Sequence, residues 1–175
     1  MAIVTGAGRG VGRVIATSLA LNGWAVACAA RTSDEVVKVV DAISHAGGSG
    51  LAIEADVVVP ADVERMVKAT VAELGTPVLL VNNAGTGVAV GPLWEVDPDA
   101  WWRDVEVSLR GTFLCSRAVL PGMIERREGR IINVASYSAI KASPYHSGYA
   151  AAKPGSTDLA RSGVFADART GAHLN

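Results

Sequence analysis

Short apolar runs alternate with longer amphipathic segments along most of this 175-residue chain. The apolar runs predict buried strands at residues 2–5, 24–30, 51–55, 77–83 and 130–135. The segments that follow them have helical spacing, at residues 11–22, 33–46, 61–74, 98–125 and 147–162. Strands that are apolar on both faces must be covered by helices on both sides. We therefore expect a three-layer α/β/α fold, with helices on both faces of a doubly wound, parallel sheet of the Rossmann type.

The first predicted strand runs directly into a glycine-rich turn, Thr5-Gly6-Ala7-Gly8-Arg9-Gly10-Val11-Gly12, which opens the first helix. Glycines at such a junction let the backbone approach a pyrophosphate, which would rest on the helix N-terminus. The spacing G-x-G-x-x-G is not met, because Val11 and Arg13 stand where its last glycine would be. The spacing that fits is T-G-x-x-x-G-x-G. A turn that merely needs glycine is the alternative, but this density of glycine favours a dinucleotide site.

The end of the second predicted strand bears on which nicotinamide cofactor would bind. An acidic side chain at that position would hydrogen-bond the ribose 2′-hydroxyl of NAD. This chain has Ala30 there, followed by Arg31. A guanidinium suits a phosphate, and Arg9 could add a second cation, so the sequence favours NADP over NAD. In the alternative interpretation, Arg31 is solvated and Asp34 turns inward to bind NAD.

Three polar residues near the fifth predicted strand form a candidate acid–base centre. Ser136 follows that strand, at the sheet edge where open α/β folds place their ligands. Tyr149 and Lys153 are four residues apart, so they share one face of the predicted helix. A nearby ammonium favours the phenolate form of a tyrosine. We therefore expect proton transfer by Tyr149 and Lys153, with Ser136 hydrogen-bonding the substrate oxygen, although each residue alone is more often structural.

Together these motifs resemble the short-chain dehydrogenase/reductase family, over residues 3–162. The resemblance includes Asn82-Asn83-Ala84-Gly85 after the fourth strand, and Asp56-Val57 after the third, which it places in the adenine pocket. It implies an oxidoreductase that uses NADP or NAD to reduce a ketone, possible substrates including a 3-oxoacyl thioester, or to oxidise a secondary alcohol, with Tyr149 as acid and base. The implied cofactor-binding residues are Thr5, Gly6, Gly8, Arg9, Gly10, Val11, Gly12, Arg31, Asp56, Val57, Asn83, Ala84, Gly85, Tyr149 and Lys153.

The chain departs from the family pattern at three places. Ser108 stands where the family usually has an asparagine that holds a backbone kink and a proton-relay water, so we count Ser108 among the catalytic candidates and expect a weaker relay. Pro154 removes a backbone donor beside Lys153 and would kink a helix interior. The resemblance fades near residue 162. We therefore expect one dinucleotide-binding and catalytic domain over 1–162 and an irregular tail over 163–175, without the last strands of the family fold.

Composition narrows the other classes of function. The formal net charge is −1, and no basic stripe points to nucleic acid. No apolar run is long enough to span a bilayer, and no metal site is expected. Cys28 and Cys115 lie in apolar runs, which indicates buried thiols and a cytoplasmic protein. By resemblance, we expect a homodimer or homotetramer formed through the long helices near 98–125 and 147–162.

Two other functions stay open at this point. The first is a shortened, non-catalytic relative that retains a dinucleotide site or only an interaction surface, which the early loss of resemblance and Ser108 would suit. The second is an unrelated Rossmann enzyme such as a methyltransferase. That second alternative leaves the spacing of Tyr149 and Lys153 to chance.

Overall fold

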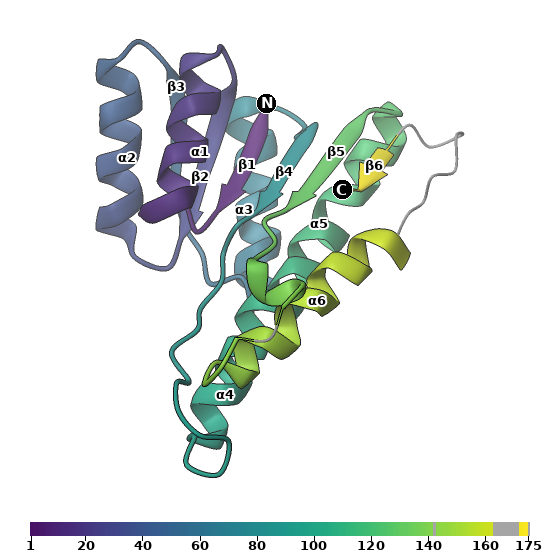
Figure 1. Ribbon diagram of the computed structural model, residues 1–175. Coiled ribbons are helices and arrows are strands. Elements are labelled where there is room, and N and C mark those ends of the chain that lie inside the picture. The colour runs from purple at the N-terminus through teal and green to yellow at the C-terminus, as the bar shows by residue number, and fades with distance from the viewer. Residues whose placement is uncertain (142, 163–171, 175) are drawn as a thin grey trace.

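A parallel sheet forms the middle layer of the computed structural model, which describes residues 1–141, 143–162 and 172–174 (Figure 1). Its strands are β1 (Ala2–Thr5), β2 (Ala25–Ala30), β3 (Ser49–Glu54), β4 (Leu79–Asn82), β5 (Gly129–Asn133) and β6 (Ala172–Leu174). They lie in the order β3-β2-β1-β4-β5-β6, and each neighbouring pair is parallel. The order reverses between β1 and β4, which is where doubly wound sheets bind their ligands.

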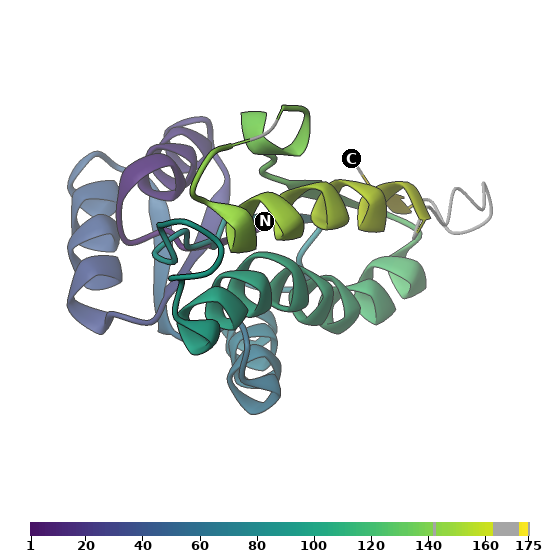
Figure 2. The same cartoon turned by 60° about the horizontal axis from the view of Figure 1, so that its bottom comes forward.

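Helices cover both faces of this sheet (Figures 1 and 2). They are α1 (Gly10–Leu21), α2 (Ser33–His45), α3 (Pro60–Leu74), α4 (Pro98–Val105), α5 (Gly111–Arg126) and α6 (Ser147–Ser162). α1 and α2 pack on one face of β1–β3, whereas α3 and α5 pack on the other face. α6 lies beside α4 and α5. The expected three-layer, Rossmann-type architecture is confirmed.

The two sides of β1 show why its sequence is apolar without interruption. Ala2 and Val4 belong to the buried cluster under α1 and α2, while Ile3 belongs to the cluster under α3 and α5. All three are fully buried. Because successive strand residues point to opposite faces, a strand covered on both sides needs apolar residues at every position.

Residues 98–126 form one continuous run of helix, close to the helical segment expected at residues 98–125. Between α4 and α5 lies a π-helical segment, Glu106–Arg110, that contains Ser108. A π-helical turn inserts one residue into the helix and is often found at functional sites. The local distortion that the family pattern attributes to an asparagine is therefore present here with a serine.

The expectation of an irregular tail over 163–175 needs one correction. Residues 172–174 form β6, in which Ala172 lies opposite Gly129 and Leu174 opposite Ile131. The outer edge of β5 offers unpaired N–H and C=O groups, so even a three-residue strand gains backbone hydrogen bonds there. Residues 163–171 and 175 lie outside the described part of the chain, and the domain boundary near 162 stays a prediction.

The burial of β4 generates a test of the core. Leu80 is fully buried, whereas Leu93 is 71% exposed. We expect Leu80→Ala to lower the free energy of unfolding by about 2–5 kcal/mol, because it leaves a cavity between the sheet and its helices. Leu93→Ala removes the same atoms from a solvated position and should change stability little. Urea denaturation of both variants measures the difference, and equal effects would contradict the described core.

Candidate active site

The glycine-rich turn is fastened to the end of β4 by hydrogen bonds. Thr5 Oγ1 accepts from the backbone N–H groups of Asn83 and Ala84, each at 3.1 Å. The Asn83 side-chain amide donates to the carbonyls of Thr5 and Gly6, at 3.0 and 3.2 Å. These four bonds join the ends of β1 and β4 at the reversal point of the sheet. Thr5 and Asn83 therefore shape the site from behind the turn.

Two glycines of the turn are required by its geometry. A Cβ atom on Gly12 would lie 2.2 Å from the carbonyl oxygen of Gly6, so no side chain fits there. Gly6 has a φ of +64°, and a Cβ on it would lie 2.9 Å from Ala84 Cα. The spacing T-G-x-x-x-G-x-G thus follows from the way the start of α1 folds back against the end of β1.

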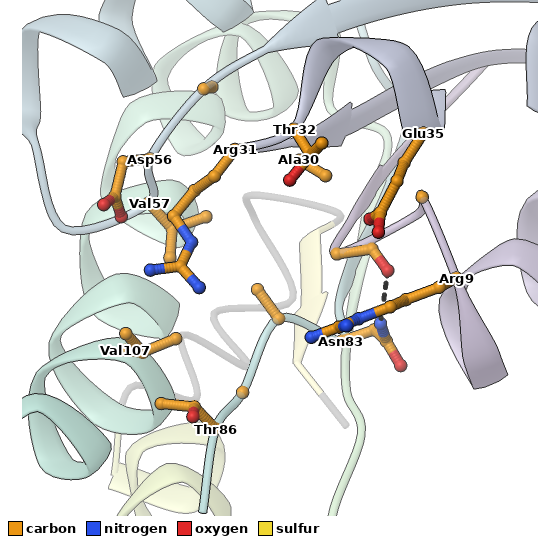
Figure 3. A pocket seen from close by; sticks show the side chains of 15 residues that line it. Arg9, Ala30, Arg31, Thr32, Glu35, Asp56, Val57, Asn83, Thr86 and Val107 are labelled. Atoms are coloured by element: carbon orange, nitrogen blue, oxygen red, sulfur yellow. Dashed lines mark hydrogen bonds between the residues drawn. The ribbon is translucent and has the colours of Figure 1, made fainter. Parts of the chain in front are cut away.

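A first pocket of about 320 Å³ opens beside this turn, between the ends of β1, β2, β3 and β4 (Figure 3). Arg9 and Arg31 reach into it from opposite sides. The predicted cofactor residues that line it are Gly6, Gly8, Arg9, Arg31, Asp56, Val57, Asn83, Ala84 and Gly85. Most of the expected binding residues are therefore brought together, with two guanidinium groups and a glycine backbone in one cavity.

The remaining predicted residues of the turn take other places. Thr5 is buried behind the turn, and Gly12 packs against Gly6. Gly10 begins α1 with a φ of +54°. Val11 is 61% exposed and lines a second pocket instead. These four positions shape the turn or the neighbouring pocket, and do not line the first one.

Sequence reasoning missed Glu35, whose carboxylate lines the first pocket near Arg9 (Figure 3). The alternative interpretation of the sequence assigns this role to Asp34, which precedes Glu35. Successive helix residues are rotated by about 100°, so only one of the two acidic residues at the start of α2 can face the cavity. The sequence contained the right segment, but the rotation of α2 was needed to select the residue.

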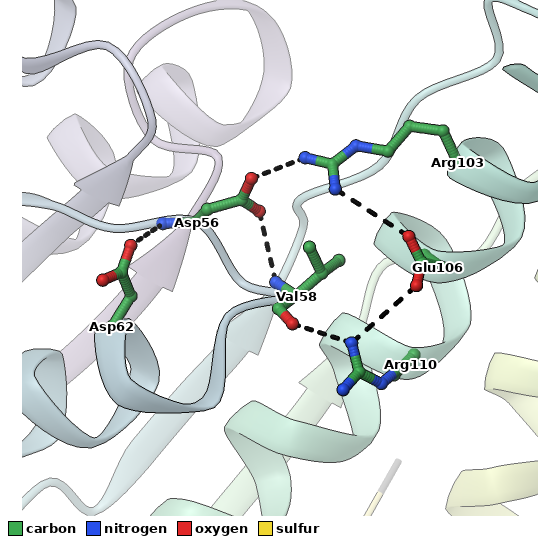
Figure 4. A network of polar contacts seen from close by, with 6 residues as sticks. All are labelled: Asp56, Val58, Asp62, Arg103, Glu106 and Arg110. Atoms are coloured by element: carbon green, nitrogen blue, oxygen red, sulfur yellow. Dashed lines mark hydrogen bonds and ion pairs between the residues drawn. The ribbon is translucent and has the colours of Figure 1, made fainter. Parts of the chain in front are cut away.

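Asp56 lies in the first pocket and is held by a network of charged groups (Figure 4). Its carboxylate accepts hydrogen bonds from Arg103, at 2.5 Å, and from the Val58 backbone N–H, at 3.2 Å. Arg103 also lies 3.9 Å from Glu106. Glu106 in turn pairs with Arg110, whose guanidinium donates to the Val58 carbonyl. The end of α4 therefore fixes an acidic wall of the pocket.

The second pocket, of about 450 Å³, adjoins the first. Asn83, Gly85 and Thr86 line both. The other residues of the second pocket are Val11, Gly87, Val134, Ala135, Ser136, His146, Tyr149 and Lys153. Three of the four catalytic candidates thus gather in one cavity, next to the pocket that contains the candidate cofactor residues.

Lys153 is the most buried of the three candidates in the second pocket, at 4% exposure. Its Nζ donates to the Val134 carbonyl at 2.7 Å and lies 5.5 Å from the centre of the Tyr149 ring. Burial lowers the pKa of the Lys153 ammonium below that of a free lysine, because the charged form loses solvation.

Pro154 lies inside α6, which nevertheless continues to Ser162. The proline therefore does not end the helix or remove Lys153 from the pocket.

The two serine candidates differ in their surroundings. Ser136 Oγ accepts from the Ser138 backbone N–H at 3.2 Å, which leaves its own proton available for donation into the pocket. Ser108 is buried in the π-helical segment, where its Oγ lies 3.5 Å from the Thr86 carbonyl. A Cβ on Gly85 would lie 3.5 Å from Ser108 Oγ and 3.7 Å from Lys153 Nζ. Ser108 and Lys153 therefore approach the same point of the backbone.

Three broader properties of the described residues concern membrane-spanning helices, metal sites and cysteines. No helix among them is long and apolar enough to cross a membrane. Within the same residues, no group of three or more histidine, cysteine, aspartate or glutamate side chains is arranged to hold a metal ion. Cys28 and Cys115 are buried free thiols, and burial raises the pKa of each to about 12. Both thiols therefore stay protonated near neutral pH.

Known proteins with similar sequences include a dehydrogenase and a reductase. A short chain dehydrogenase of Pseudocercospora fijiensis is 40% identical over 154 residues, which cover 87% of this chain and 50% of the relative. The 3-oxoacyl-(acyl-carrier-protein) reductase FabG of Staphylococcus epidermidis is 35% identical over 175 residues, covering 99% of this chain and 71% of the reductase. The chain thus spans about half the length of the first relative and more of the second.

A solved structure agrees with these relatives. A variant of actinorhodin polyketide ketoreductase with NADPH superposes with a TM-score of 0.95 at 33% identity, covering 99% of this chain and 67% of the ketoreductase. The family model described as short chain dehydrogenase matches residues 1–174. With the glycine-rich turn, the Asn83 segment and the Tyr149–Lys153 pair in register on the fold, the chain belongs to the short-chain dehydrogenase family.

Proposed function

We propose that this chain forms the cofactor site and acid–base centre of an oxidoreductase that uses NADP or NAD to interconvert a ketone and a secondary alcohol. The observation that carries the proposal is the shared wall of the two pockets. A group that extends along Asn83, Gly85 and Thr86 passes from the pocket of the glycine turn to the pocket of Tyr149 and Lys153. This continuity suits a long dinucleotide whose reactive end meets a substrate.

The first pocket fits such a dinucleotide. The bare backbone of Gly6 and Gly8 lines it next to the start of α1, where a helix N-terminus favours phosphate. Arg9 and Arg31 supply positive charge, and Asp56 offers acceptor oxygens at the far wall. We propose that these residues hold the phosphates and the adenine end, and that Lys153 lies toward the nicotinamide ribose.

The residues of the second pocket would manage the proton. The nicotinamide cofactor, when bound, donates or accepts the hydride. Tyr149 would give its phenolic proton to the substrate oxygen during reduction, and would take it back during oxidation. The Lys153 ammonium near its ring stabilises the phenolate that remains. Ser136, with its proton free, would orient the same oxygen.

Removal of the Tyr149 hydroxyl tests this assignment. We expect Tyr149→Phe to lower kcat for ketone reduction by about 100- to 10,000-fold, because no other group replaces the proton donor. The Kd for NADPH should stay unchanged. NADPH oxidation with a panel of ketones and 3-oxoacyl thioesters gives the rates. Tyr145→Phe is the matched control, since Tyr145 is 62% exposed, and equal turnover in wild type and Tyr149→Phe would contradict the role.

We propose that Ser108 supports a proton relay weakly, through a water shared with Lys153. The support is the approach of both side chains to Gly85. Serine has a shorter reach than the asparagine common in the family. Ser108→Ala should therefore lower kcat less than Tyr149→Phe does, measured in the same assay. A loss as large as that of Tyr149→Phe would mean that Ser108 is essential.

We further propose that NADP is preferred to NAD. Arg9 and Arg31 both enter the first pocket and suit a 2′-phosphate, while Glu35 in the same pocket opposes it. We expect Arg31→Ala to raise the Kd for NADPH by about 10- to 100-fold, the loss of a charged hydrogen bond, with little effect on NADH. Glu35→Gln should tighten NADPH binding. Fluorescence titration measures both.

The exposed Arg13 on α1 provides the control for this experiment, because it bears the same charge. Arg13→Ala should leave the Kd values of both cofactors unchanged. If Arg31→Ala weakens NADPH and NADH equally, Arg31 does not discriminate between them, and the proposed preference is wrong.

The names of two relatives support a proposal for the substrate class. The FabG reductase acts, by its name, on a 3-oxoacyl group, and the actinorhodin enzyme is a polyketide ketoreductase. We propose a ketone within an acyl thioester as the substrate of this chain. The non-catalytic alternative is not favoured, because Ser136, Tyr149 and Lys153 share one pocket. Assembly as a homodimer or homotetramer and a cytoplasmic location stay predictions.

A further inference from the structure

We propose that Asp104 is a positioning residue that holds the wall of the substrate pocket against Tyr149, an inference that rests on the function proposed above. Asp104 lies near the end of α4 and is fully buried. Its Oδ1 and Oδ2 accept hydrogen bonds from the backbone N–H groups of Val88 and Ala89, each at 3.0 Å. A buried carboxylate is costly unless it is hydrogen-bonded, so these contacts account for its presence in the interior.

The segment that donates hydrogen bonds to Asp104 lacks regular secondary structure. Residues 83–90, between β4 and α4, form neither helix nor strand. Because these residues pair with no strand, their buried backbone N–H groups need other acceptors, and side chains can supply them. Asp104 accepts hydrogen bonds from the backbone of two successive residues and thereby fixes the path of residues 86–91. We call residues 86–91 the wall segment.

The wall segment lies directly on the catalytic tyrosine. Gly87 lines the second pocket, and a Cβ atom on it would lie 3.4 Å from Tyr149 Cγ. The Gly91 backbone N–H donates to the Tyr145 carbonyl at 2.9 Å, which joins the far end of the wall segment to the loop before α6. A displacement at Val88 and Ala89 would therefore move the backbone that supports the Tyr149 ring.

The turn of α4 that contains Asp104 also holds the start of α6. Trp101 Nε1 donates to Ser147 Oγ at 3.1 Å. A Cβ on Gly148 would lie 2.9 Å from the Trp101 carbonyl oxygen and 3.3 Å from Asp104 Cβ. Gly148 directly precedes Tyr149 in α6. Asp104 thus sits where α4 contacts both the element that carries Tyr149 and the segment that packs on its ring.

Asp104→Asn tests the inference with little change of shape. The amide keeps one acceptor oxygen, but its NH2 group would face one of the two backbone N–H donors. We expect kcat for ketone reduction to fall about 10- to 100-fold through misplacement of Tyr149. The Kd for NADPH should not change. Hydrogen exchange of the Val88 and Ala89 amides should accelerate about tenfold, the effect of one lost hydrogen bond.

Asp99→Asn is the matched control, because Asp99 is exposed on the same helix and the chemical change is identical. It should alter neither kcat nor exchange. If Asp104 had only a structural role, Asp104→Asn would lower the melting temperature of the protein. Its kcat and KM, measured well below that temperature, would then equal those of wild type. That result, or unchanged exchange at Val88 and Ala89, would overturn the proposal.

Hydrogen exchange also separates this inference from the proposed function. If wild type bound NADPH but reduced no ketone, the proposed function would fail, and the exchange of Asp104→Asn would still test the grip on the wall segment. If Asp104→Asn does not fold, hydrogen exchange of the wild-type protein tests the proposal instead. The Val88 amide should be protected although the Val88 side chain is 67% exposed, and rapid exchange at Val88 and Ala89 would contradict the proposal.

Discussion

The hydrogen bonds between Thr5 and the Asn83 segment are the interaction on which the rest of the site depends. They join β1 to β4 at the reversal of the sheet, and they use a side chain from each strand end to satisfy backbone groups of the other. Each such bond contributes about 1 kcal/mol to stability. Their larger effect is geometric, because Asn83 belongs to the wall of both pockets.

The end of α4 is the second fixed point. Adjacent residues of this helix reach in different directions, Arg103 to Asp56 in the first pocket and Asp104 to the backbone beside the second. The π-helical segment that follows places Ser108 behind Gly85. One short stretch of helix therefore supports the walls of the first pocket, the second pocket and the region between them.

Much of the fold was predictable because its strands are buried on both faces and so read as uninterrupted apolar runs. The central strands β1 and β4 are of this kind. The glycine turn and the Tyr149–Lys153 pair were also predictable, since their geometry is local to one turn or one helix face. β6 was not expected, because three residues carry almost no pattern of their own.

The residues that sequence reasoning missed act over long separations. Arg103 forms an ion pair with Asp56, which is 47 residues away in the sequence. Neither local segment contains a pattern that predicts this pair. In the sequence, Asp104 looks like an ordinary aspartate of an amphipathic helix. Only the packing of α4 in the folded protein shows that its carboxylate is buried. Glu35 required the rotation of α2. In each case the deciding information is the relative placement of two elements, which a periodic pattern does not contain.

The central claim is that the two adjoining pockets bring a nicotinamide and a ketone together for hydride transfer. The most direct measurement follows the hydride itself, with NADPH deuterated at the transferring position of nicotinamide C4 and a 3-oxoacyl thioester as substrate. Mass spectrometry should find the deuterium on the new carbinol carbon of the product. An alcohol product without deuterium, or no product from protein that binds NADPH, would contradict the account.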